Sequence, residues 1–223
     1  LWLVGIFSSE ISQYPHVLKR VKLCRQNRLK MKDASSKKLA LTPETFRDTN
    51  NPQNYIALPI ISSERRQYIP MNYLDNNTIP TNQLQTIPNA SLYHFGVLNS
   101  AMHMSWMRTV CGRLKGDYRY SASIVYNTFP WPEVSEEQKK AVSELADMVL
   151  NIRNMYPDKT LAEMYDPDKM PEPLAEAHHN LDVAVDSLYR NTPFESDEER
   201  LQLLFKLYEK LVAAKNAKEK PHA

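Results

Sequence analysis

Glycine is scarce in this sequence, and its scarcity excludes the nucleotide sites that are built from glycine-rich loops. Only Gly5, Gly96, Gly112 and Gly116 occur among 223 residues, where average usage would give roughly 16. Neither a G-x-G-x-x-G turn nor a Walker loop can be written with these four. We therefore expect no nucleotide cofactor, and no other cofactor, to be bound by this chain itself.

Cysteine and long apolar runs are scarce as well. Cys24 and Cys111 are the only cysteines, too few for a disulfide framework or a four-thiolate zinc site. Apolar runs such as residues 55–61 fall far short of the ~18 residues that a membrane span needs, and no signal sequence opens the chain. We expect a soluble, cytoplasmic protein without a membrane partner. Its start, Leu-Trp-Leu-Val rather than Met, predicts that it is the middle of a longer protein.

No arrangement of side chains predicts a catalytic or metal site. His178 and His179 are adjacent, so on a helix they point about 100 degrees apart and cannot share a metal. His94, His103 and Cys111 are separated by more than two helical turns, which is not ligand spacing. The expected function of the chain, taken alone, is recognition rather than catalysis.

Charge divides the chain near Pro132. Residues 1–132 carry 16 basic and 7 acidic side chains, a net +9, whereas residues 133–223 carry 12 and 19, a net −7; together they give the net +2 of the whole. Such a division suggests a polyanion partner for the first part. Much of the excess lies between Lys19 and Lys38, on a helix expected after Pro15 that bears one apolar stripe. A solvated helix, a calmodulin target or a membrane-surface helix would look similar.

The periodicity of apolar residues predicts an α+β fold. Strands are expected at residues 55–61, 67–71, 84–87 and 118–126, and one helix at residues 89–111 with Asn89 as its N-cap. After Pro132 the pattern is helical only, with helices expected at residues 135–155, from about Pro173, and after Ser196. We therefore predict a mixed α/β domain at residues 1–132 and a small, acidic helical bundle at residues 133–223.

Several stretches in order resemble the target-recognition and C-terminal regions of MmeI-like restriction-modification enzymes, which join an adenine-specific DNA methyltransferase to an endonuclease. They are SSERRQYIP at residues 62–70, TIPNASLYHFG at 86–96, SAMHM at 100–104, CGRLKGDYRYS at 111–121, YNTFPWP at 126–132 and LAEMYDP at 161–167. The resemblance implies a type II restriction-modification enzyme as parent, with double-stranded DNA as partner. It also implies an upstream methyltransferase domain that holds the catalytic Asn-Pro-Pro-Tyr loop and the S-adenosylmethionine pocket.

The short stretch at residues 112–119, flanked by two glycines, is the first candidate for reading bases. In an extended segment Lys115, Asp117 and Arg119 would share one face, and such a row can match the acceptors of guanine and the amino donor of cytosine. A surface salt-bridge ladder is the alternative, and the resemblance favours base contact because relatives place base-contacting side chains here. Asn82 and Gln83 are second candidates, as amides suited to adenine, or else form a polar turn.

Basic side chains elsewhere are candidates for phosphate contacts, which set affinity without carrying sequence information. Arg65 and Arg66 are assigned to phosphate or to a structural ion pair, and Tyr118, Tyr120 and Tyr126 to packing rather than base stacking. The alternative function is a protein-interaction or scaffold module whose basic part binds an acidic partner. The phosphate candidates are Lys19, Arg20, Lys22, Arg25, Arg28, Arg65, Arg66 and Arg113.

Overall fold

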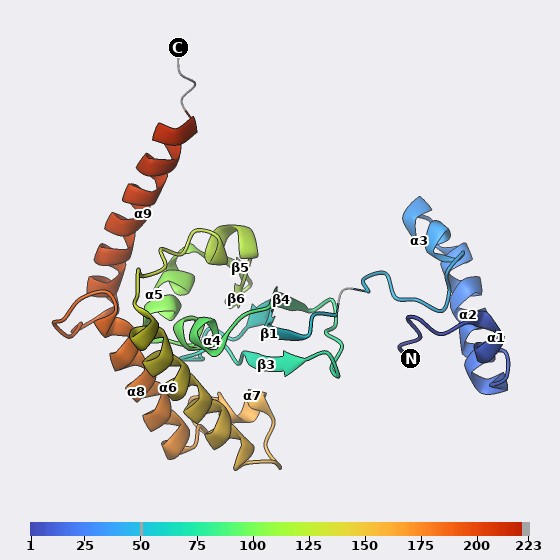
Figure 1. Ribbon diagram of the computed structural model, residues 1–223, viewed down its shortest axis with the longest axis horizontal. Helices are drawn as coiled ribbons and strands as arrows, with labels where there is room; N and C mark the ends of the chain where they lie inside the picture. Colours follow the sequence, from blue (N-terminus) through green and yellow to red (C-terminus); the bar gives the residue numbers. More distant parts are fainter. Residues whose placement is uncertain (50, 220–223) are drawn as a thin grey trace. The chain divides into compact units, whose positions relative to one another are not determined.

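The computed structural model describes residues 1–49 and 51–219, which form two compact units, Leu1–Asn51 and Pro52–Ala223 (Figure 1). Each unit is described by itself. Among the described residues, no helix is long and apolar enough to cross a membrane. The predicted boundary after Pro132 stays a prediction; within the second unit, helices from both sides of that position share one core.

The first unit is helical. It contains α1 (Ser8–Ile11), α2 (Pro15–Lys30) and α3 (Ala34–Leu39), and Asp33 caps α3 by accepting a hydrogen bond from the backbone of Ser36 at 2.7 Å. The helix expected after Pro15 is confirmed, although its apolar stripe is only half-buried. Of the residues that the structure describes in this unit, only Ile11 and Ala40 are buried.

The second unit begins with two small antiparallel sheets that are joined at Ile60. In the first sheet β1 (Asn54–Pro59) lies between β3 (Asn72–Asp75) and β4 (Leu84–Pro88). In the second, β6 (Asp117–Arg119) lies between β2 (Ile61–Ser62) and β5 (Gly112–Leu114). The strand predicted at residues 55–61 is thus two strands that belong to different sheets.

Three other predictions about this region are wrong. Residues 67–71 are not a strand; their backbone is irregular and is held by side chains from distant helices. Residues 118–126 turn from β6 into the π-helix η1 (Ala122–Tyr126). The single helix expected at residues 89–111 is two, α4 (Leu92–Leu98) and α5 (Ala101–Val110), because Asn99 and Ser100 end one and cap the next. The N-cap of α4 is Ser91, while Asn89 adopts a φ of 55°.

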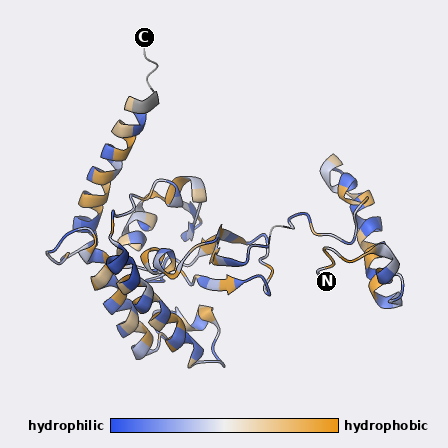
Figure 2. Cartoon of the chain, viewed as in Figure 1, coloured by the Kyte–Doolittle hydropathy of each residue, from blue (hydrophilic) through white to orange (hydrophobic). Residues whose placement is uncertain are grey.

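The helices expected after Pro132 are confirmed as α6 (Glu136–Asn154), α8 (Glu172–Ser187) and α9 (Asp197–Glu219), with the short α7 (Leu161–Met164) in addition. α9 packs on α5, where Phe205 and Tyr208 meet the ring of Trp106. Leu204 of α9 is buried, but Leu211 is 53% exposed, and Figure 2 shows apolar residues continuing along α9 towards its C-terminal end. The α+β fold is confirmed.

Gly96 sets how closely α4 approaches α6 and α8. A Cβ atom at this position would lie 2.8 Å from Cγ1 of Val142, 3.2 Å from Cβ of Ala146 and 3.3 Å from Cδ1 of Leu181. All three atoms belong to buried side chains of the core. The core is therefore packed so closely at Gly96 that it leaves no room for a side chain there.

We expect Gly96→Ala to lower the free energy of unfolding by about 1–3 kcal/mol, because an extra methyl group in a close-packed core forces its neighbours apart. Gly112→Ala is the matched control, since a Cβ there would meet nothing closer than 3.9 Å. Chemical denaturation of both variants measures the difference. Equal stability of the two variants would contradict this role for Gly96.

Two buried histidines make stability depend on pH. His103 and His178 are fully buried, and burial lowers the pKa of each to about 3 from 6.5. Each is therefore neutral in the folded chain, and the stability that it contributes is present above pH 6.5 and is lost as pH falls towards 3. Burial raises the pKa of Asp182 to about 6, which offsets part of this loss in acid.

His103→Phe removes one of these groups while keeping a ring in the cavity beside Phe129. As pH falls from 6 to 4, we expect the free energy of unfolding of the wild type to fall more steeply than that of the variant. The difference in slope should be about 1.4 kcal/mol per pH unit, which corresponds to the uptake of one proton by His103 on unfolding. Urea denaturation across this range is the measurement. Parallel curves would show that His103 does not titrate on unfolding.

Candidate nucleic-acid interface

The predicted base-reading stretch is a β-hairpin with a two-residue turn. β5 and β6 pair antiparallel, with Gly112 opposite Arg119 and Leu114 opposite Asp117, so Lys115 and Gly116 form the turn. The predicted extended row is therefore wrong at Lys115, which adopts a left-handed φ of 57°. Asp117 and Arg119, two residues apart on β6, do share a face, and exposed Lys115 precedes them at the tip.

The tyrosines of this region pack, as predicted. Tyr118 and Tyr120 are buried, and Tyr126 is half-buried. The hydroxyl of Tyr120 lies 3.1 Å from Nε2 of buried His103, and the guanidinium of Arg113 lies 4.2 Å from the centre of the Tyr118 ring. None of the three rings is an open platform for stacked bases.

Ile60 lies between the loop that carries Asn82 and Gln83 and the end of β6, the strand that carries Asp117 and Arg119. Its N–H donates to the carbonyl of Gln83 at 3.1 Å, and its carbonyl accepts from the N–H of Tyr120 at 2.8 Å. In the flanking ladders Pro59 lies opposite Leu84 and Ile61 opposite Arg119. The Asn82–Gln83 loop and the end of β6 therefore flank one residue, although they are far apart in the sequence. This junction of the two sheets was not predicted from the sequence.

All five candidate base readers have polar side-chain atoms free for a ligand. Among the described residues, the structure gives no intramolecular hydrogen bond or ion pair to any of these side chains. Asp117 is half-buried and the other four are exposed. A free donor or acceptor on the surface can match a base edge without first losing another partner. The five residues are Asn82, Gln83, Lys115, Asp117 and Arg119.

The candidate phosphate contacts in the second unit are, by contrast, mostly engaged. Arg65 forms an exposed ion pair with Asp168 at 2.5 Å. Arg113 donates to the carbonyl of Gly116 at 3.1 Å and lies 3.8 Å from Glu64. Half-buried Arg66 has a buried Nε without a hydrogen-bond partner. For Arg65 the alternative of a structural ion pair is the one that the structure contains.

On α2 of the first unit, the basic residues divide into exposed and engaged ones. Lys19, Arg20, Lys22 and Arg25 are exposed. Arg28 instead donates to three backbone carbonyls, those of Leu39 at 2.8 Å, Thr42 at 2.9 Å and Thr45 at 2.7 Å. Arg28 therefore joins α2 to the end of α3 and the loop after it, a structural role that a basic run in the sequence does not reveal.

Among the described residues, no group of three or more histidine, cysteine or acidic side chains could hold a metal ion. His178, buried on α8, lies 2.7 Å from the hydroxyl of Tyr165 and is part of the core. The acidic residues at the start of α9 also have structural partners: Asp197 pairs with Arg108 at 2.9 Å and with Arg200 at 3.1 Å.

We expect Arg28→Gln to loosen the first unit, because one amide cannot satisfy three carbonyls that a guanidinium satisfies together. Arg25→Gln, on the same helix, is the control, since that side chain is exposed. Limited proteolysis should cut residues 39–45 at least several-fold faster in the Arg28 variant alone. Equal cutting of both variants would show that the three hydrogen bonds do not hold this loop.

Comparisons with known proteins bear on this surface. The family model "MmeI, target recognition domain" matches residues 1–133, and "MmeI, C-terminal domain" matches residues 134–215. DNA methyltransferase A of Bacillus subtilis (strain 168) is 45% identical over 212 residues, which cover 95% of this chain and 24% of that protein. The solved structure of the Type IIL restriction-modification enzyme MmeI in complex with DNA matches with a TM-score of 0.88 and 44% identity, over 96% of this chain and 29% of that one. This chain belongs to the family of MmeI target recognition and C-terminal domains.

Proposed function

We propose that this chain reads DNA sequence for a methyltransferase that is carried on the same, longer polypeptide. The observation that carries the proposal is the junction at Ile60, where two loops present polar side chains that have no partner within the described residues. Membership of a target-recognition family supports it, as does the close match to an enzyme solved in complex with DNA.

The chemistry of the five side chains suits the major groove. Lys115 would donate to the two acceptors of guanine, and Asp117 would accept from the amino group of the paired cytosine. The guanidinium of Arg119 could donate two hydrogen bonds to a second guanine, and the amides of Asn82 and Gln83 match the donor and acceptor of adenine. Lys115 lies in the exposed turn and Asp117 begins the strand that follows it, and on this proposal the two would contact opposite bases of one pair.

Affinity would come from phosphate contacts by the exposed basic side chains of α2, which are Lys19, Arg20, Lys22 and Arg25. Arg65, Arg66 and Arg113 are second candidates, and Arg65 would have to exchange Asp168 for phosphate. Arg28 contributes to this surface by holding α2 in place.

The first unit would also contact protein. Phe7, Leu41 and Leu1 are 77%, 76% and 68% exposed, and DNA phosphates would not cover such apolar side chains. We infer that it packs on the methyltransferase domain, which would bind S-adenosylmethionine, and that the whole enzyme acts in the cytoplasm. A scaffold module that binds an acidic protein through its basic residues is the competing function.

The double variant Lys115→Glu, Asp117→Arg tests the reading of bases, because it reverses the order of donor and acceptor. At one position of the target, preference should change from G·C to C·G, with the other positions unaltered. Each good contact contributes about 1–3 kcal/mol, or roughly ten- to a hundred-fold in discrimination. Sequencing of methylated products of the full-length polypeptide measures the change. An unaltered target, or a uniform loss over all sequences, would exclude this assignment.

A control replaces Lys19, Arg20 and Lys22 by glutamine. In this variant, affinity should fall by the same factor for every duplex, whatever its sequence. The slope of log affinity against log salt should decrease by about one per lost phosphate contact. A scaffold module would show neither the steep salt dependence nor the inversion of the base pair.

A further inference from the structure

Residues 64–71, between β2 and β3, form no helix or strand, yet Tyr68, Ile69 and Met71 are almost fully buried. A buried segment without ladder hydrogen bonds needs other partners for its backbone. Two of its N–H groups bond to nearby carbonyls, Arg66 to Ser63 and Met71 to Ile69. The carbonyls of Glu64, Gln67 and Met71 accept from side chains, which come from the hairpin β5–β6 and from the helices.

On the hairpin side, Glu64 lies under the turn. The hydroxyl of Tyr118 donates to the carbonyl of Glu64 at 3.3 Å, and the Glu64 carboxylate lies 3.8 Å from Arg113. A Cβ at Gly116 would come within 2.8 Å of Oε1 of Glu64. The tip of the hairpin thus rests directly on the start of the segment.

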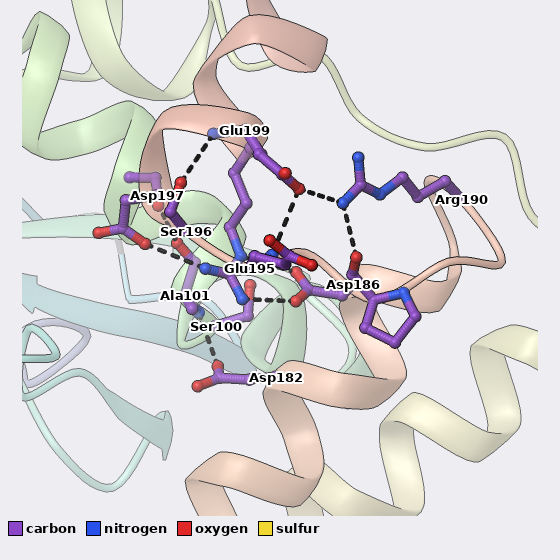
Figure 3. Close-up of polar contacts among 12 residues, drawn as sticks. Ser100, Ala101, Asp182, Asp186, Arg190, Glu195, Ser196, Asp197 and Glu199 are labelled. Carbon is purple, nitrogen blue, oxygen red and sulfur yellow. Dashed lines mark hydrogen bonds and ion pairs between the residues drawn. The ribbon is translucent and has the colours of Figure 1, made fainter.

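On the other side, Asp182 of α8 bridges the segment and α5. Its Oδ2 accepts from the hydroxyl of Tyr68 at 2.6 Å. Its Oδ1 accepts from the N–H of Ala101 at 2.6 Å, a contact that Figure 3 shows. Ala101 is the first residue of α5, the helix that ends one residue before β5. One buried carboxylate therefore holds both the segment and the start of the helix that leads into the hairpin.

Two arginines complete the attachment. Arg153 of α6, only 5% exposed, donates to the carbonyl of Met71 at 2.7 Å. Arg108 of α5 donates to the carbonyl of Gln67 at 2.7 Å and pairs with Asp197 of α9. Three helices that follow Pro132 thus reach the segment, directly or through α5.

We propose that Asp182 and Arg153 are positioning residues for DNA reading: through residues 64–71 they fix the hairpin that carries Lys115, Asp117 and Arg119. The inference rests on the proposed function for its effect on DNA, but not for the positioning itself. The C-terminal helices, on this view, set the geometry of recognition as well as contributing stability.

Tyr68→Phe tests the positioning, because it removes one hydroxyl and leaves the ring stacked on His178, 4.1 Å between centroids. Tyr189→Phe is the matched control; its hydroxyl donates to the carbonyl of Pro130 at 3.0 Å, away from the segment. Amide hydrogen exchange of the full chain, without DNA, reports on the hairpin. In Tyr68→Phe the amides of residues 112–119 should exchange about tenfold faster, as expected for loss of a hydrogen bond to a carboxylate. In Tyr189→Phe they should not change.

Replacements of Asp182 separate positioning from simple loss of stability. Asp182→Asn keeps an acceptor for Ala101 and a polar partner for Tyr68, so hairpin exchange should stay within a few-fold of the wild type. Asp182→Leu has neither and should loosen the hairpin before the chain unfolds globally. Uniform acceleration at all amides in Asp182→Leu, with none specific to the hairpin in Tyr68→Phe, would overturn the proposal.

The DNA experiment uses the same variants in the full-length polypeptide. Discrimination between the cognate duplex and duplexes altered at the pair read by Lys115 and Asp117 should fall about tenfold in Tyr68→Phe, with an unchanged salt slope, and should stay normal in Tyr189→Phe. If the wild type shows no sequence preference, the proposed function fails, while hydrogen exchange still decides the positioning. If Tyr68→Phe discriminates as well as the wild type, the positioning proposal fails alone.

Discussion

The second unit depends on the contact that α6 makes along α4. Val142, Ala146, Val149 and Arg153 recur at helical spacing on one face of α6 and are all buried. At one end of this face Gly96 lets the helices approach until a methyl group would not fit. At the other end Arg153 lies 3.5 Å from the side chain of Asn99, the residue at which α4 ends. α5 begins directly after this end of α4, at Ala101.

The core holds several buried polar groups, Arg153, His178 and Asp182 among them. Among the described residues Arg153 has no carboxylate partner; its partners are the hydroxyl of Tyr165, backbone and amide oxygens, and the ring of Phe95. Burying a charge without such partners is strongly unfavourable. These groups therefore require one arrangement of α6, α8 and the segment at residues 64–71, whereas apolar side chains alone would tolerate several.

What the sequence predicts well is what local periodicity determines. α2, α6 and α8 each have an apolar stripe and a recognisable start, such as the Ser135 cap of α6 with Gln138 three residues on, and all three were found. Residues 67–71 show the limit, because a short apolar run with aromatic Tyr68 and β-branched Ile69 resembles a strand. The carbonyls of Gln67 and Met71 instead accept hydrogen bonds from Arg108 and Arg153, which lie 41 and 82 residues away in the sequence. Hydropathy places Arg153 and Asp182 on the surface, so no local signal could reveal these contacts.

In the candidate site, too, the sequence predicts some features and not others. Its residues were named from the sequence, since glycines at 112 and 116 mark a turn and the charges stand out. The left-handed turn at Lys115 follows from the local pairing of β5 with β6, whereas the junction at Ile60 depends on pairing between strands that are distant in the sequence. Because the five base-reading candidates have no intramolecular partner among the described residues, their replacement leaves no buried group unsatisfied and costs little stability. Tyr68 and Asp182, by contrast, are buried and hydrogen-bonded to each other, and Asp182 also binds Ala101, so they cannot change so freely. A surface of free side chains on a fixed support allows the sequence that is read to change while the support stays the same.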